Sequence, residues 1–304
     1  MNQPSSPGAQ LSMEQLSSLH GLELKARLLV EGYLSGAHRS PYRGFSVEFA
    51  EHREYVPGDD LRYVDWKVYA KTDRYYLKQY DEETNYSSLL IVDRSQSMAY
   101  RSSQVNVRKI EYATWLAAAL AYVIIQQRDA AGLVTYSSHI HDWLRPETSE
   151  PHWREICRLL EQLSPTGPSH LVQVIHALGE RMTRRGVMII LSDFFEPWES
   201  LAQGLQYLHH LRHDVILLQV IDPAEEIFPF ENMTRFDDLE SGDQKTVHGR
   251  TLRPIYQKMY QQHVGRLRGL SRELGFDYWQ FRTDAPPGPG LGLLLRHRRQ
   301  KRLL

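Results

Sequence analysis

The sequence predicts an α/β protein with a doubly wound, mainly parallel sheet and a small N-terminal β subdomain. Short apolar runs of about five residues, typical of strands buried on both faces, alternate with longer stretches of helical periodicity. Two of these runs are followed at once or nearly so by an aspartate, Asp93 and Asp193. Alternating strands and helices favour a parallel sheet with right-handed crossovers.

The composition fits one large domain with a smaller companion. The chain has 304 residues, of which 41% are apolar, and 36 Lys and Arg stand against 37 Asp and Glu. This balance gives no sign of a nucleic-acid partner. The single cysteine, Cys157, fits a reducing compartment. No run reaches the roughly 18 apolar residues of a membrane helix, and the N-terminus lacks a signal pattern. We therefore expect no integral membrane segment and a cytoplasmic location.

The first 85 residues divide into three predicted segments. Residues 1–12, rich in Pro, Ser, Gln and Gly, are expected to be a disordered leader. Residues 13–41 hold an amphipathic helix, which reaches about Leu34, and a linker. Residues 42–85 contain alternating strand patterns and a Pro-Gly turn, and they predict the β subdomain.

Residues 86–284 predict the doubly wound domain. Its expected strands are 89–92, 130–136, 140–144, 187–191, 215–220 and 276–281. Its expected helices are 107–127, 153–163, 169–184, 199–211 and 252–274, with Ser169 placed to cap the third of them. The polar segment 228–250 suggests a hairpin. Residues 285–304 are predicted to be a flexible basic tail after a Pro-Gly linker.

A candidate metal site follows the first strand of this domain. Asp93, Ser95 and Ser97 lie on one tight loop directly after the buried run. Ligands of an open α/β sheet bind just beyond the carboxyl ends of its strands. A carboxylate with two hydroxyls forms a hard oxygen cluster that suits Mg²⁺. The alternative is a serine-rich turn that only caps the next helix.

The loop Asp93-x-Ser95-x-Ser97-Met98 resembles the metal-ion-dependent adhesion site of von Willebrand factor A-type domains. Upstream, the run from Gly44 to Phe49 and the run from Arg53 to Trp66 resemble the signature of the domain-of-unknown-function 58 family. In that family the signature precedes an A-type domain that bears this loop. Two motifs in the expected order coincide by chance far less often than either alone. The resemblance covers roughly residues 25–285 and implies a von Willebrand factor A-like fold.

The resemblance also implies the remaining metal ligands. In A-type domains a second loop normally contributes a Thr, and Ser169 is the matching position here, with Thr166 as the other candidate. Ser offers the same donor chemistry as Thr. The third loop's aspartate matches Asp193, although a strand-end turn or a helix cap would also explain that residue. The expected ion is Mg²⁺, with Mn²⁺ or Ca²⁺ as alternatives.

A site of this kind favours binding over catalysis. Two carboxylates leave a divalent ion undercompensated, so an acidic side chain from a partner protein can complete its coordination. Members of the resembled family are associated with MoxR-type AAA+ ATPases, which implies a non-enzymatic adaptor or cofactor of such an ATPase in complex assembly or maturation. The alternative is a metal-dependent hydrolase that uses Asp93 and Asp193, with Asp222 as a further acid. No general base or nucleophile is evident beside them.

Overall fold

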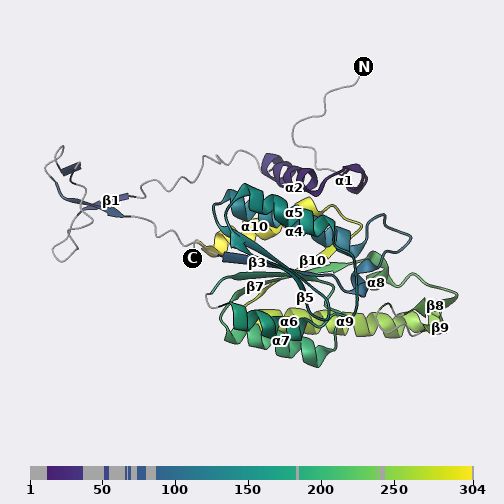
Figure 1. The fold of residues 1–304 in the computed structure, drawn as a ribbon. Helices are drawn as coiled ribbons and strands as arrows, with labels where there is room; N and C mark the ends of the chain where they lie inside the picture. Colours follow the sequence, from purple (N-terminus) through teal and green to yellow (C-terminus); the bar gives the residue numbers. More distant parts are fainter. Residues whose placement is uncertain are drawn as a thin grey trace, which may run out of the picture. The chain divides into compact units, whose positions relative to one another are not determined.

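The computed structural model describes residues 12–36, 51–54, 66, 68–69, 74–79, 87–182, 185–237, 239 and 244–302. The chain divides into two compact units, residues 39–85 and residues 1–38 with 86–304. The larger unit is a central sheet with helices on both faces (Figure 1).

In the smaller unit, strands β1 (Glu51–Glu54) and β2 (Tyr76–Gln79) pair antiparallel. The rings of Tyr69 and Tyr75 stack with their centroids 4.5 Å apart. The leader apart from residue 12, the run from Gly44 to Phe49, the Pro-Gly turn and most of the family signature lie outside the described residues.

The doubly wound, mainly parallel sheet is confirmed. It has six strands in the order β10-β7-β6-β3-β4-β5, and only β5 runs antiparallel to its neighbour. The chain builds outward from β3 in one direction and then returns to lay β6 on its other side. This places a topological switch point between β3 and β6. The strands are β3 (Ser87–Asp93), β4 (Ala130–Tyr136), β5 (Ile140–Glu147), β6 (Val187–Ser192), β7 (Asp214–Ile221) and β10 (Asp277–Arg282).

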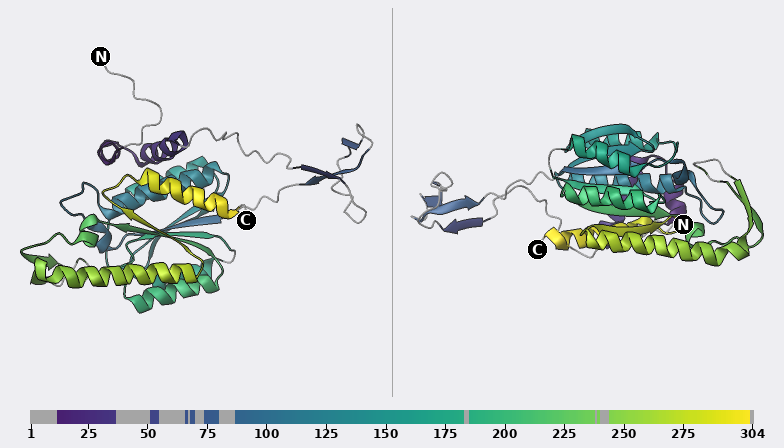
Figure 2. Two further views of the ribbon diagram at one scale, coloured as in Figure 1. Left: turned by 180° about the vertical axis from the view of Figure 1, so that it is seen from behind. Right: turned by 90° about the horizontal axis from the view of Figure 1, so that it is seen from below.

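Two helical layers cover the sheet (Figure 2). Each layer packs on one face of the sheet and forms a hydrophobic core with it. Because side chains alternate along a strand, β3 contributes to both cores: Leu90 and Val92 face one layer, and Leu89 and Ile91 face the other. The first layer contains α2 (Leu22–Gly36), α4 (Lys109–Gln126), α5 (Glu150–Glu161) and α10 (Pro287–Arg302), and the second contains α6 (Leu171–Arg181), α7 (Trp198–His210) and α9 (Gly249–Glu273). The elements predicted for 86–284 are present, with ends shifted by no more than three residues.

The N-terminal helix predicted from residue 13 is two helices. Helix α1 (Met13–Ser18) is capped by Ser12, and α2 begins after Gly21, whose positive φ of 85° suits a residue without a side chain. Leu16, Leu22 and Leu29 are buried in the core of the larger unit. These helices are therefore part of that core.

The prediction of a flexible basic tail is wrong, because residues 287–302 form helix α10. Leu291 and Leu294 are buried against the first layer. Arg298 pairs with Asp214 and Asp277, and Lys301 lies 2.5 Å from an Asp277 oxygen. The expected Pro-Gly linker forms the first turn, where amide hydrogens have no helical partner and proline costs little.

The ion pairs of Asp277 predict how acid affects the attachment of α10. Burial acts to raise the pKa of Asp277, but Lys301 and Arg298 outweigh it and hold that pKa below its ordinary value. The stabilisation is therefore present above about pH 4, the unfolded value, and is lost as pH falls through the lower folded value. We expect Asp277→Asn to lower the free energy of unfolding by about 2 kcal/mol at pH 7. Urea unfolding of both proteins should show this difference shrink toward pH 3; a constant difference would contradict the assignment.

The hairpin predicted within 228–250 is present as β8 (Met233–Asp237) and β9 (Gln244–His248), which pair antiparallel. Helix α9 follows at once, and its first half extends past the carboxyl edge of the sheet beside the hairpin (Figures 1 and 2). Among the described residues no helix is both long enough and apolar enough to cross a bilayer.

Candidate metal site

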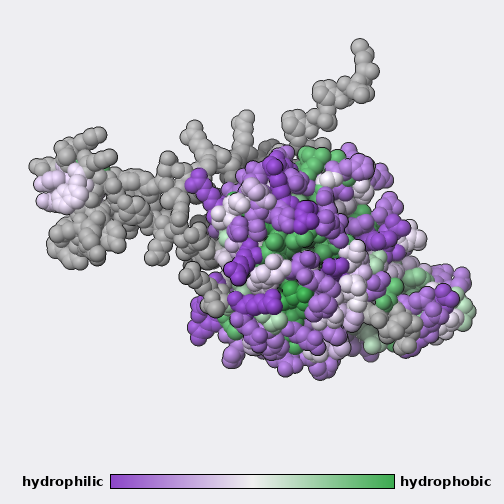
Figure 3. Space-filling view, in the orientation of Figure 1, coloured by the Kyte–Doolittle hydropathy of each residue, from purple (hydrophilic) through white to green (hydrophobic). Residues whose placement is uncertain are grey.

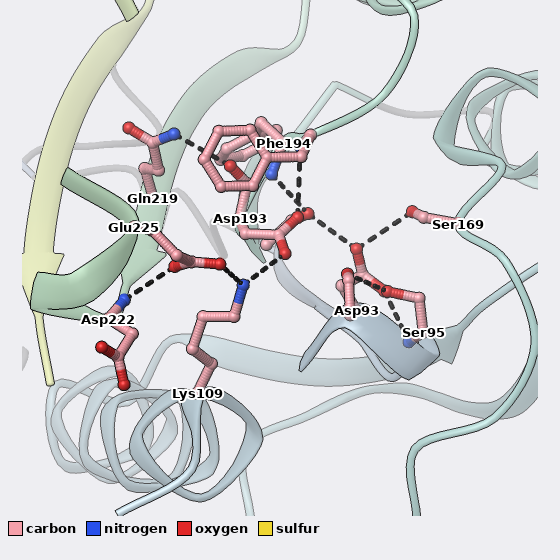
Figure 4. A network of polar contacts seen from close by, with 12 residues as sticks. Asp93, Ser95, Lys109, Ser169, Asp193, Phe194, Gln219, Asp222 and Glu225 are labelled. Carbon is pink, nitrogen blue, oxygen red and sulfur yellow. Dashed lines mark hydrogen bonds and ion pairs between the residues drawn. The ribbon is translucent and has the colours of Figure 1, made fainter. Parts of the chain in front are cut away.

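The predicted ligands come from three loops that meet at the switch point of the sheet. Asp93 is the last residue of β3, and Asp193 directly follows β6, the neighbouring strand. Ser169 precedes α6. The side chains of Asp93, Ser169 and Asp193 gather at this edge (Figure 4). Folding thus brings together residues that are 76 positions apart in the chain, Asp93 and Ser169.

Asp93 is fully buried and is surrounded by hydrogen-bond donors. Its Oδ1 accepts the amide hydrogen of Ser95 at 2.8 Å. Its Oδ2 accepts from three hydroxyls: Ser192 at 2.7 Å, Ser169 at 3.0 Å and Tyr136 at 3.3 Å. Burial, and after it the negative charge of Asp193, raise the pKa of Asp93 to about 7, although the hydrogen bonds from Ser192 and Ser95 oppose the rise.

The serine loop does not cap the next long helix. Ser95 and Ser97 lie at the short 3₁₀ helix η2 (Gln96–Ala99), and their hydroxyl oxygens are 3.1 Å apart. Helix α4 begins later, at Lys109. Ser95 occupies the N-cap position of η2 but makes no side-chain capping hydrogen bond, so the helix-cap alternative for this loop is wrong.

A buried lysine that the sequence reasoning missed neutralises part of the site. Lys109 Nζ lies 2.7 Å from Asp193 Oδ2 and 2.5 Å from Glu225 Oε1. Burial acts to lower the pKa of Lys109, but the two carboxylates outweigh it and raise that pKa. Burial likewise acts to raise the pKa of Asp193, and Lys109 outweighs it, so Asp193 stays below its ordinary value. Lys109 and Asp193 therefore form a charged pair in the protein interior.

The position of Lys109 offered one signal. It is the first residue of α4, where the helix dipole disfavours a cation. A lysine at such a position needs a nearby carboxylate to compensate. The two partners follow 84 and 116 residues later, and no local pattern connects them.

The structure distinguishes the two candidates for the second loop. The Ser169 hydroxyl contacts Asp93, whereas Thr166 is exposed and its amide donates to the Arg94 carbonyl. Ser169 does not cap α6 as predicted. Glu196 has that role: its Oε1 accepts the Leu171 amide at 2.9 Å and lies 2.7 Å from the Ser169 hydroxyl. Burial raises the pKa of Glu196.

Asp222 has a structural role. Its Oδ1 accepts the Ala224 amide and caps α8 (Pro223–Ile227), and its Oδ2 accepts the Ser102 amide, both at 2.8 Å. Both oxygens thus bind backbone amides, as expected for a helix cap that also anchors a loop.

The chemistry of the predicted ligands fits a hard divalent ion. The set contains two carboxylates and three hydroxyls, all oxygen donors, which is the chemistry of Mg²⁺ rather than Zn²⁺. No group of three His, Cys, Asp or Glu side chains suited to a metal occurs among the residues that the structure describes. An ion here would therefore rely on serine oxygens and water beside Asp93 and Asp193.

The sheet order and the Asp-x-Ser-x-Ser loop at its switch point define a von Willebrand factor A-like domain. Similar solved structures include the conserved hypothetical protein BatB from Bacteroides thetaiotaomicron, with 14% identity, a TM-score of 0.49, and coverage of 71% of this chain and 99% of that one. The vWF domain of the pili tip protein Mfa5 from Porphyromonas gingivalis has 12% identity, a TM-score of 0.37, and coverage of 71% and 95%.

The family described as "Protein of unknown function DUF58" matches residues 51–266. The chain therefore belongs to this family. An uncharacterized protein of Mycobacterium tuberculosis is 28% identical over 232 residues, which are 74% of this chain and 71% of the relative.

Proposed function

We propose that this protein is a non-enzymatic interaction module that binds a partner's carboxylate through a divalent ion. Asp93, Ser95, Ser97, Ser169 and Asp193 would hold Mg²⁺, or alternatively Mn²⁺ or Ca²⁺. The bound ion supplies the positive charge that joins the two proteins across their interface.

The convergence of three loops supports the proposal. The Ser169 oxygen is 3.0 Å from Asp93 Oδ2, and the Ser95 and Ser97 oxygens are 3.1 Å apart. Asp193, from the third loop, accepts the amide hydrogen of Phe195 and pairs with Lys109 beside them. A turn whose only task was to cap a helix would not need hydroxyls from separate loops directed at one pair of aspartates.

The ion pair of Asp193 disfavours the hydrolase alternative. Asp193 accepts from the Phe195 amide at Oδ1 and from Lys109 at Oδ2. Each of these oxygens keeps a second lone pair that can face a metal ion. Lys109, however, holds the pKa of Asp193 below its ordinary value, which makes it a weak general base.

For the partner, we propose a MoxR-type AAA+ ATPase, with this protein as its adaptor in the assembly or maturation of complexes in the cytoplasm. Family membership supports this partner. Cys157 supports the compartment: it is buried, and burial raises the pKa of its thiol to about 12, which makes it a packing residue rather than a reactive thiol.

Ser97→Ala tests the metal bridge with little disturbance, since Ser97 is only half-buried. We expect the variant to bind Mg²⁺ at least about tenfold more weakly in titration calorimetry, and to lose capture of the purified ATPase to the same extent as treatment with EDTA. Ser200→Ala, an exposed serine on α7, is the matched control and should behave like the parent. Capture that neither Ser97→Ala nor EDTA reduces would refute the proposal.

A further inference from the structure

We infer that an exposed row of side chains leading to the metal site is the docking surface for an acidic amphipathic segment of the partner. The docking row consists of the exposed Ile255 and Met259 and the half-buried His263 on α9, together with the exposed Phe195. The inference rests on the proposed function, because it specifies the partner that the module would bind.

Exposed apolar side chains gather at this end of the larger unit. Six of the ten large apolar side chains that are exposed in the described residues lie on α9, α8, the hairpin segment or the loop after β6: Phe195, Ile227, Met233, Leu239, Ile255 and Met259. Met259 is 65% exposed and Ile255 57%. Single exposed apolar residues are normal, but a concentrated group indicates an interaction site.

The docking row runs along one side of α9 toward the aspartates. Ile255, Met259 and His263 follow one another at steps of four, so they are neighbours on the helix surface. The His263 ring centroid lies 5.7 Å from that of Phe195, and its Nε2 is 2.8 Å from the Phe194 carbonyl oxygen. Phe195 is two residues beyond Asp193, so the row ends beside the proposed ion.

An aromatic cluster on the adjacent face of α9 holds this projecting end in place. The ring centroids of Phe228 and Tyr256 are 4.5 Å apart, and Phe236 stacks on Phe228 at 5.5 Å. The Arg253 guanidinium donates to the carbonyls of Phe228 and Phe230. A surface held in this way loses little conformational freedom when a partner binds.

The charges of α9 define the partner. The helix carries six basic residues against one acid, Glu273. Arg266 is exposed and lies two turns beyond Met259 on the same side of the helix, and the exposed Lys258 directly precedes Met259. Figure 3 shows hydrophobic green atoms among hydrophilic purple ones where the hairpin and α9 project. An apolar row with cations beside it and beyond its end is complementary to a helix with apolar residues at steps of three and four and acids between them.

Site-specific photo-crosslinking tests the partner's chemistry. A benzoylphenylalanine would replace Met259 in the full-length chain, and the same group at Leu293, which is 50% exposed on α10, is the control. The protein is crosslinked in native extract, and the partner segment that becomes attached is identified by sequencing. That segment is then synthesised as a peptide. Its affinity for the parent, Met259→Glu and Leu293→Glu is then measured by fluorescence anisotropy with Mg²⁺. We expect an acidic segment with apolar residues at helical spacing, and at least tenfold weaker binding to Met259→Glu only.

Each other outcome would overturn the inference: a neutral or basic segment, a second copy of this chain, crosslinking no stronger than at position 293, or equal binding to all three proteins. Repeating the anisotropy with EDTA separates the two proposals. Binding that depends on Met259 but survives EDTA keeps the docking row and rejects the metal bridge. Binding that EDTA abolishes but Met259→Glu leaves intact does the reverse.

Discussion

Replacing Lys109 with methionine is expected to lower the free energy of unfolding by about 3–5 kcal/mol, because it breaks a buried ion pair from one side. The lysine side chain is 1% exposed, and its partners Asp193 and Glu225 are 2% and 14% exposed. Methionine preserves most of the volume and removes only the charge. Two buried carboxylates then face each other without a cation.

Urea unfolding at neutral pH measures the loss. Adding Glu225→Gln to Lys109→Met should restore part of the stability, because it removes one of the two uncompensated charges. Lys258→Met, an exposed lysine on α9, is the matched control and should change stability by no more than about 0.5 kcal/mol. If Lys109→Met cost no more than this control, the buried pair would not have the role that its geometry indicates.

Asp93→Asn is expected to weaken Mg²⁺ binding by more than about 100-fold. Residues that only hydrogen-bond a metal ligand already contribute up to about 100-fold. The free energy of unfolding should change by no more than about 1 kcal/mol. An asparagine oxygen can still accept the Ser95 amide hydrogen, and its amide can donate to the hydroxyls of Ser169 and Ser192. The variant also removes one of two neighbouring buried charges. Asp93→Asn therefore tests metal binding without a large change in stability.

Asp93→Ala provides the contrast. It leaves several buried donors without their acceptor, so we expect it to cost about 1–3 kcal/mol in addition to the lost metal binding. Titration calorimetry with Mg²⁺ and urea unfolding of the two variants check both parts. Glu180→Gln, which changes an exposed carboxylate on α6, controls for loss of charge. Unchanged Mg²⁺ binding by Asp93→Asn would exclude Asp93 as a ligand.

The fold could be predicted from sequence where the signal was local. The run before Asp93 is buried on both faces, so it is apolar at every position from Leu89 to Val92. Helix α10 gave no such signal. Its basic residues suggested a solvated tail, since the acids that pair with Arg298 lie 84 and 21 residues earlier, and few apolar residues mark its buried face.

The residues of the candidate site could likewise be predicted only where their signal was local. Asp93, Ser95 and Ser97 follow one strand and could be found from their spacing. Glu196 and Glu225 could not, because each is defined by a contact to another loop or strand, and Lys109 offered only its unfavourable position at the start of a helix. Ser192 stands directly before Asp193 at a strand end, so it was the most accessible of the missed residues. A polar residue that ends a buried strand beside an acid deserves the same scrutiny as the acid.

Lys109 affects how Mg²⁺ and the partner's carboxylate would bind and dissociate. Because its ammonium is tethered next to Asp193, a free Mg²⁺ ion must approach a locus that already contains a positive charge. A lone carboxylate, in turn, would find no cation with an open coordination position. A partner carboxylate that coordinates the ion offsets this repulsion, so we expect Mg²⁺ and the partner each to strengthen the binding of the other. Withdrawing either one would then weaken the binding of the other.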